Sequence, residues 1–179
     1  MRKALILLAL ALMAGGSAMA QEDRGYEVSG NFQYVRFNPG SGASGINCAG
    51  GSGTGAFYLS SSIGIVGEFG ACRVTGLASG VSAHQMDYLF GPKAYFHARG
   101  RVYPFVQALF GGERLSAGYG GATGATNAFA TAVGGGADIT LTKHVTFRAV
   151  QVDYLYTHFG GASQNNFRLQ SGIVWRIGR

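Results

Sequence analysis

Seven charged or amide side chains stand singly in stretches that are otherwise apolar or rich in small residues: Glu68, Lys93, Gln107, Glu113, Arg148, Asp153 and Arg168. Such groups can carry a proton or ion path, or they can pair with one another as structural elements, because a buried charge must find a partner. If strands turn them all to one side, they meet in a confined interior. We therefore expect a hydrogen-bonded ionic network made of these seven residues, in preference to a proton or ion path.

The four histidines show no spacing that would gather them around a metal ion. His97 and His144 fall in predicted tight turns, and His84 and His158 near one rim of the predicted fold. A lipase-type Gly-x-Ser-x-Gly elbow is absent, and the glycine runs lack the preceding strand and following helix of a phosphate-binding loop. We expect no metal, no cofactor and no enzymatic activity.

The start of the chain has the three parts of a secretory signal peptide. Met1-Arg2-Lys3 is basic, Ala4 to Ala14 is an uninterrupted apolar run, and Ala18-Met19-Ala20 is a small-x-small cleavage site. Because a spanning helix needs about 20 residues, the apolar run is too short to be a membrane anchor. We predict that residues 1–20 are removed on export and that residues 21–179 form one domain.

The two cysteines, Cys48 and Cys72, are predicted to form a disulfide. A turn at Ser60 to Ser62 would bring them to similar depth on adjacent strands, and an exported protein matures in an oxidising compartment. Closing this loop would stabilise the fold by about 3 kcal/mol. The alternative is two free thiols; a metal site would need further ligands nearby.

Composition narrows the class of protein. The sequence has 31 glycines, 3 prolines and 12% aromatic residues, so it matches neither collagen nor a disordered tract. Removal of Arg2 and Lys3 with the signal peptide leaves 12 basic and 8 acidic residues, a net charge of +4. This modest charge is spread along the chain, without a basic run or aromatic cluster, so we expect no nucleic-acid partner.

Alternation of apolar and polar residues predicts strands throughout the mature chain. The last of them, Asn165 to Ile177, carries Phe167, Leu169 and Trp175 on one face and arginine and glutamine on the other. The other predicted strands are 26–37, one ending at 56–60, 63–72, 84–96, 102–112, 129–139 and 145–156. No later apolar stretch is long enough for a spanning helix, and apolar-out, polar-in alternation is typical of a membrane barrel.

Connection lengths support the same fold class. The predicted loops Asn38 to Gly50, Val74 to Ala83, Arg114 to Thr126 and Thr157 to Gln164 are long, whereas the connections between them are short. Outer-membrane barrels have short periplasmic turns and longer extracellular loops. We predict an all-β fold, an eight-stranded antiparallel up-and-down transmembrane β-barrel, whose interior is just wide enough for side chains to fill.

The seventh predicted strand breaks the alternation. Arg148 has one parity, and Gln151 and Asp153 have the other. A β-bulge near Ala149 or Val150 would turn all three inward. Without it, a polar group would meet lipid, at a cost of about 2 to 4 kcal/mol for an arginine at the midplane.

The chain resembles the small outer-membrane beta-barrel family, the OmpA/OmpX-like eight-stranded group. The resemblance covers the mature chain and rests on the export signal, the loop alternation and the last strand. Ser171, Gly172, Trp175 and Ile177 match the insertion signal read by the barrel assembly machinery, although the chain ends Ile177-Gly178-Arg179 instead of in phenylalanine. Leu89 to Lys93 and Arg148 to Tyr156 also resemble strands of this family.

The resemblance implies a monomeric, non-enzymatic protein in outer-membrane lipid, with no open pore and a structural or surface-interaction role through its extracellular loops. An outer-membrane lipid-modifying enzyme is one alternative, but the His-x-Ser pair of the lipid A deacylase type is absent after both His84 and His158. A soluble lipocalin-like ligand-binding barrel is the other, and it would place the apolar faces inside.

Overall fold

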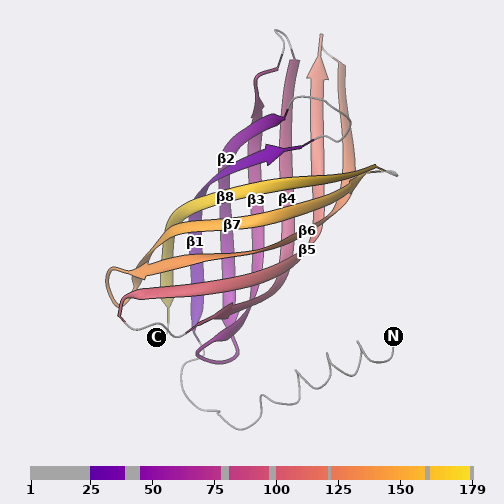
Figure 1. The fold of residues 1–179 in the computed structure, drawn as a ribbon. Coiled ribbons are helices and arrows are strands. Elements are labelled where there is room, and N and C mark those ends of the chain that lie inside the picture. Colours follow the sequence, from indigo (N-terminus) through magenta and orange to yellow (C-terminus); the bar gives the residue numbers. More distant parts are fainter. Residues whose placement is uncertain are drawn as a thin grey trace, which may run out of the picture.

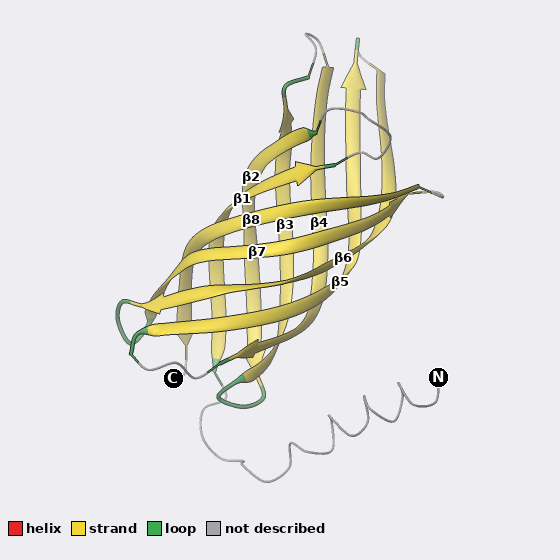
Figure 2. Ribbon diagram, viewed as in Figure 1, coloured by secondary structure: helices red, strands yellow, loops and turns green. Residues whose placement is uncertain are grey.

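The computed structural model describes residues 25–38, 45–77, 81–96, 100–120, 122–159 and 162–177, and these residues form eight strands (Figures 1 and 2). In chain order the strands are β1 (Tyr26–Phe37), β2 (Ile46–Tyr58), β3 (Ile63–Thr75), β4 (Val81–Tyr95), β5 (Val102–Tyr119), β6 (Ala122–Thr140), β7 (Val145–Phe159) and β8 (Ala162–Ile177). The predicted signal peptide, residues 1–20, lies outside the described residues. In the described part, no helix is long and apolar enough to cross a membrane.

The strands close into a barrel in sequence order. Every neighbouring pair is antiparallel, and β8 pairs with β1 from Tyr26 opposite Ile177 to Arg36 opposite Phe167. Closure leaves no unpaired sheet edge, as a strand protein in lipid requires. The predicted eight-stranded antiparallel barrel is confirmed.

The two ends of the barrel differ. Strands β1, β3, β5 and β7 finish at one end of the barrel, here called the hairpin end, and β2, β4, β6 and β8 finish at the opposite, terminal end (Figure 1). At the terminal end, residues 59–62 and 141–144 are tight turns in which Ser60 Oγ and Thr142 Oγ1 accept backbone hydrogen bonds from Ile63 and Val145.

The predicted long loops are wrong in extent, because most of their residues continue the strands. β2 begins at Ile46, and β5 and β6 continue to a tip at Gly120, whose φ of 58° suits glycine. Small residues such as Gly, Ala and Thr suggested loops, but cross-strand pairing continues through them from Arg114 opposite Asn127 to Tyr119 opposite Ala122. Of the third predicted loop, residues 114–119 belong to β5 and residues 122–126 to β6.

Burial alternates along the strands, with the polar face inside. Gln33, Asp87 and Arg168 are fully buried, whereas Phe32 and Phe90 are 60% and 66% exposed. A soluble ligand-binding barrel would have the opposite arrangement, so the lipocalin-like alternative is contradicted. The exposed apolar side chains form the face that meets lipid.

The predicted β-bulge in β7 is present. Asp138 of β6 pairs with Arg148 and Ala137 with Val150, which leaves Ala149 as an extra residue. On the other side, Ser171 of β8 faces two residues, because Arg148 pairs with Gly172 and Gln151 with Gln170. Arg148, Gln151 and Asp153 are all buried as a result.

The predicted Cys48–Cys72 disulfide joins β2 and β3, with a Cα–Cα distance of 5.6 Å. The two cysteines are diagonal neighbours, since Cys48 pairs with Val74 and Cys72 with Gly50. Gly50 leaves space for this diagonal crossing, because a Cβ there would meet Cys72 Cβ at 2.8 Å. The bond lies inside the barrel near its hairpin end.

Candidate functional site

The barrel interior contains the main candidate site, and its centre is Arg168 on β8. The Arg168 guanidinium contacts three carboxylates: Asp87 Oδ2 at 3.1 Å from Nη1, Asp153 Oδ2 at 2.9 Å from Nη2, and Glu68. These carboxylates come from β4, β7 and β3, so one cation joins four strands across the lumen. Arg168 and its partners are fully buried, and we call them the Arg168 cluster.

Amide side chains complete the Arg168 cluster. Gln33 Nε2 donates to Asp87 at 3.2 Å, and Gln170 Nε2 donates to Glu68 at 3.3 Å. Asp153 accepts from Gln151 at 2.8 Å and from Gln107 at 3.4 Å. Each carboxylate thus has an amide donor besides the arginine, as buried polar groups require.

A second cluster lies toward the terminal end, around Asp138 and Glu27. Asp138 forms a two-bond ion pair with Arg148, at 2.9 Å and 3.2 Å, and Glu27 pairs with Arg176 at 2.8 Å. Lys93 lies between the two carboxylates, 3.9 Å from Glu27 and 4.0 Å from Asp138. We call these five residues the Asp138 cluster.

Aromatic residues enclose the Asp138 cluster. Tyr58 OH donates to Glu27 at 2.7 Å, and Tyr95 OH donates to Asp138. The Lys93 ammonium lies 4.1 Å from the centroid of the Phe105 ring, and the Arg148 guanidinium lies 4.8 Å from it, so both cations contact its π face. Gln151 joins the two clusters, since it accepts from Arg148 at 3.1 Å and donates to Asp153. The polar network is therefore continuous between the two clusters.

Inward-facing glycines make room for these side chains. A Cβ at Gly70 would lie 2.6 Å from the Asp87 carboxylate. A Cβ at Gly172 would clash with the backbone oxygen of Gly30 and lie 2.6 Å from Asn31 Oδ1, and one at Gly136 would clash with the backbone oxygen of Val150 and lie 2.9 Å from the Phe105 ring. The high glycine content thus has a packing cause beyond turns, because eight strands leave little lumen for large polar groups.

The interior charges do not balance. The Asp138 cluster holds two carboxylates and three cations, whereas the described residues in the half of the lumen nearer the hairpin end include four carboxylates and one cation, Arg168. The fourth carboxylate is Glu113 on β5, which pairs in register with Asp87. Glu113 is 1% exposed, and neither of its carboxylate oxygens has a hydrogen-bond partner.

All seven residues predicted from the sequence are buried in the lumen, and the structure brings six of them into the two clusters or their amide shell; Glu113 lies apart. The sequence prediction missed Glu27, Asp87, Asp138 and Arg176 as members. All four lie on inward parity, and strict use of strand alternation would have found them. Tyr58 and Tyr95 are also buried on inward parity, but their residue type does not mark an inward position, because tyrosine is enriched at the membrane interfaces of such proteins as well.

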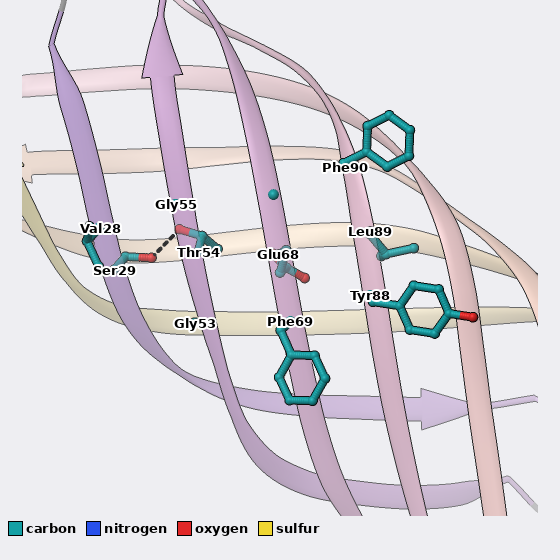
Figure 3. Close-up of a pocket in the computed structure, with 11 residues that line it drawn as sticks. Val28, Ser29, Gly53, Thr54, Gly55, Glu68, Phe69, Tyr88, Leu89 and Phe90 are labelled. Carbon is teal, nitrogen blue, oxygen red and sulfur yellow. Dashed lines mark hydrogen bonds between the residues drawn. The ribbon is translucent and has the colours of Figure 1, made fainter.

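The wall outside the lumen is apolar and locally hollow (Figure 3). Outward glycines on β2 and β3, Gly53, Gly55 and Gly67, floor a hollow of about 620 Å³ bordered by Val28, Phe69, Tyr88 and Phe90. In the same view Ser29 and Thr54 hydrogen bond at 2.6 Å and, like Glu68, are buried. The hollow is open, and its rim is apolar except for the hydroxyl group of Tyr88.

Three arginines face outward near the hairpin end: Arg36 on β1, Arg73 on β3 and Arg114 on β5. Arg36 pairs with Asn47, which pairs with Thr75, two residues beyond Arg73 toward the hairpin end. In the same way Arg73 pairs with His84, which pairs with Ser116, two residues beyond Arg114. We call these three residues the arginine arc.

Barrel geometry places the arginine arc at one height. Following the paired residues from Gly30 on β1 across β2 to β7 leads to Ser163 on β8. The direct β1–β8 pairing, however, joins Gly30 to Ile173, which lies ten residues further along β8 than Ser163. The strand pairing is therefore staggered by slightly more than one residue per strand around the barrel. Successive arginines of the arc are offset by two residues over two strands, so they lie at nearly the same height along the barrel axis. With strands about 4.8 Å apart and tilted by about 40°, neighbouring members lie roughly 12 Å apart.

Exposed charge in the described residues is entirely basic. All six described carboxylates face the lumen, and the exposed charged residues are Arg36, Arg73, Arg101, Arg114 and Lys143. The outward-facing apolar residues begin at Tyr26 on β1 and at Ile63 on β3. Arg36 lies ten positions after Tyr26, and Arg73 lies ten positions after Ile63. At about 3.3 Å per residue and a tilt of about 40°, this spans about 25 Å, the height of the apolar band of a membrane barrel.

A serine and a histidine meet on the outer face of the β7–β8 hairpin, although they are not adjacent in sequence. His158 Nδ1 and Ser163 Oγ are 3.1 Å apart, and Tyr156 OH lies 2.8 Å from the same serine. No described carboxylate lies on this outer face to orient the imidazole, since all six are inside the barrel. Among the described residues, no group of three or more His, Cys, Asp or Glu side chains could hold a metal ion.

Comparison with known proteins shows the family. The family model described as "Outer membrane protein beta-barrel domain" matches residues 5–174. The fold is similar to Neisserial surface protein A (TM-score 0.64, 13% identity, 88% of this chain and 100% of that chain) and to Ail of Yersinia pestis (TM-score 0.60, 14% identity, 87% and 100%). It is also similar to the N-terminal β-barrel domain of OprF from Pseudomonas aeruginosa (TM-score 0.55, 13% identity, 88% and 100%). No curated protein matches the chain. Because the family model spans nearly the whole sequence and the closed barrel turns its apolar face outward, the chain belongs to the outer membrane protein beta-barrel domain family and is a β-barrel of the bacterial outer membrane.

Proposed function

We propose that this protein is a closed, non-enzymatic outer-membrane barrel that acts through its outer surface, where the arginine arc binds phosphate or sulfate groups carried on sugars. The hairpin end would face the cell exterior, and the filled lumen would pass no solutes. The observation that carries the proposal is the segregation of charge: every described carboxylate is inside, and Arg36, Arg73 and Arg114 stand at one height outside.

The chemistry of the arginine arc suits such anions. A guanidinium presents a planar set of donors that matches two oxygens of a phosphate or sulfate group. Arg36 Nη1 donates to Asn47 Oδ1 at 3.0 Å, which steadies that side chain, and Arg73 and Arg114 have no ion-pair partner among the described residues. One of the similar structures, that of Ail, was solved in complex with the heparin analogue sucrose octasulfate, which supports polyanion binding as a function of such a barrel.

The anion could belong to a lipid headgroup or to a soluble polyanion, and two assays separate them. In the first, sucrose octasulfate is titrated into the detergent-folded protein by calorimetry. In the second, the folded barrel is reconstituted in nanodiscs with a phosphorylated glycolipid, and retention of that glycolipid over neutral lipid is measured. The test variant replaces Arg36, Arg73 and Arg114 with Gln, and the control variant replaces Arg101 and Lys143, exposed basic residues at the terminal end.

We expect the triple variant to lose at least tenfold in affinity in one of the two assays, with a loss that shrinks at high salt because exposed charges are screened. The control variant should keep the binding of the unmodified protein. The assay that responds identifies the source of the anion. Equal binding by the triple variant and the unmodified protein in both assays would overturn the proposal.

Acyl hydrolysis is the second candidate function, because a serine and a histidine are hydrogen bonded on the outer face. No described carboxylate lies beside the pair to orient the base, as a Ser–His hydrolase needs for full activity. We therefore interpret the His158–Ser163 contact as a cross-strand hydrogen bond. Release of fatty acid from phospholipid or glycolipid by the folded protein, abolished by Ser163→Ala, would establish the enzyme instead.

A further inference from the structure

A cavity opens into the lumen at the hairpin end, separate from both ionic clusters. It has a volume of about 140 Å³ and is lined by Phe37, Ile46, Val74, Leu77, Ala83, Glu113, Leu115 and Gln164. Six of these eight side chains are apolar, and they come from the ends of β1 to β5 and the residues that follow β3. Glu113 is the one ionisable group in the lining.

Glu113 is unusual among the buried carboxylates of this barrel. Glu27, Glu68, Asp87, Asp138 and Asp153 all contact an arginine or lysine. Glu113 has no such partner among the described residues, and both of its oxygens lack hydrogen bonds although the residue is 1% exposed; the nearby buried amide of Gln85 on β4 also has an unpaired Nε2 and is neutral, so it supplies no charge. A buried carboxylate without a partner is costly and either keeps a proton or takes a cation from outside.

The protein cannot supply that cation from the neighbouring network. Among the described residues, Arg168 is the one cation in this half of the lumen, and it already contacts Glu68, Asp87 and Asp153. Asp87 lies directly across from Glu113 in the β4–β5 register and adds a second negative charge on the same side. The local field therefore favours a positive group in the cavity.

We propose that this cavity binds a small amphipathic ammonium ion, with the charged nitrogen at Glu113 and a short carbon chain against Phe37, Val74 and Leu115. An apolar lining with one convergent ionisable group is the usual composition of a small-molecule site. The site is independent of the arginine arc, because its charge is negative and it lies inside the barrel.

The test uses the full mature chain folded in an uncharged maltoside detergent, since zwitterionic detergents carry cationic head groups that would compete. n-Butylammonium is titrated while the backbone amide resonances of Ala83, Glu113 and Leu115 are followed by NMR. n-Butanol supplies the carbon chain without the charge, and ammonium supplies the charge without the chain. Glu113→Gln preserves the size of the side chain, and Leu115→Ala tests the apolar wall.

We expect saturable shifts with n-butylammonium, at least tenfold weaker binding of n-butanol and of ammonium, and at least tenfold weaker binding of n-butylammonium to Glu113→Gln. Leu115→Ala should weaken binding several-fold. Equal affinity of Glu113→Gln and the unmodified protein, or equal affinity for ammonium and n-butylammonium, would overturn the proposal. If Glu113→Gln does not fold, the two ligand controls and Leu115→Ala decide. The variant in which Gln replaces Arg36, Arg73 and Arg114 should bind n-butylammonium as tightly as the unmodified protein does. The experiments on the cavity and on the arginine arc can therefore contradict either proposal without affecting the other.

Discussion

Replacement of Arg168 with Gln should be among the most damaging single substitutions in the barrel. The guanidinium contacts Glu68, Asp87 and Asp153, and the part of the chain that the structure describes has no other cation in that half of the lumen. Removal of one partner from a buried ion pair costs about 3 to 5 kcal/mol, because the remaining charge stays buried. Each carboxylate keeps an amide donor, from Gln170, Gln33 or Gln151, so we expect a loss near the lower value, about 3 kcal/mol.

The free energy of unfolding can be measured by urea titration of the protein folded into lipid vesicles. Trp175 is the one tryptophan in the sequence and reports on the β8 wall without labelling. Arg73→Gln is the matched control, since it removes the same side chain from an exposed position and should cost less than about 1 kcal/mol. Adding Asp153→Asn to Arg168→Gln should recover part of the loss, because it removes one uncompensated charge. An Arg168→Gln variant as stable as Arg73→Gln would refute the reasoning.

Three further predictions follow from the strands. Replacing Cys48 and Cys72 with Ala should lower the free energy of unfolding by about 3 kcal/mol, measured by the same urea titration, and leave the fold intact. An unchanged midpoint of urea unfolding, or mass mapping that finds both thiols free without reductant, would contradict the disulfide. Deletion of Ala149 should give a barrel that still folds, because it restores regular alternation and pairing on both sides of β7. Deletion of Val152 should abolish folding, because the residues on one side of the deletion would then face the wrong side of the sheet. Folding is detected as heat-modifiable gel mobility, and equal outcomes for the two deletions would contradict this register. Trp175→Asp should reduce assembly into the outer membrane, measured by fractionation of cells, more than any substitution in a connection at the hairpin end; equal reductions would remove Trp175 from the predicted insertion signal.

The sequence was enough to predict the barrel, its strand number and the direction of each face, because alternation with period two follows directly from strand geometry. β1 was predicted to the residue, and the β7 bulge was predicted because Arg148 and Gln151 could not otherwise both avoid lipid. The ends of β5 and β6 were missed. Their Gly, Ala and Thr residues have a loop-like composition, and cross-strand pairing sets their structure more than local preference does.

The candidate site was only partly predictable. Inward parity identifies which charges are buried but not which of them pair, since pairing depends on the stagger of the barrel. Arg168 and Glu68 lie on strands that are not adjacent and meet only across the lumen. The isolation of Glu113, the level positions of the three outward arginines and the contact of His158 with Ser163 depend on the same register. None of these relations has a local sequence signal.

Single-channel recording tests the central claim, that a paired polar network closes this outer-membrane barrel, most directly. The folded protein, verified by its anomalous mobility on an unboiled gel, is inserted into planar lipid bilayers at moderate salt. We predict that inserted protein adds no steady unitary conductance, because the Arg168 and Asp138 clusters and the amides that join them fill the lumen. Reproducible conductance steps from folded protein would contradict the account and would assign the interior charges to an ion path.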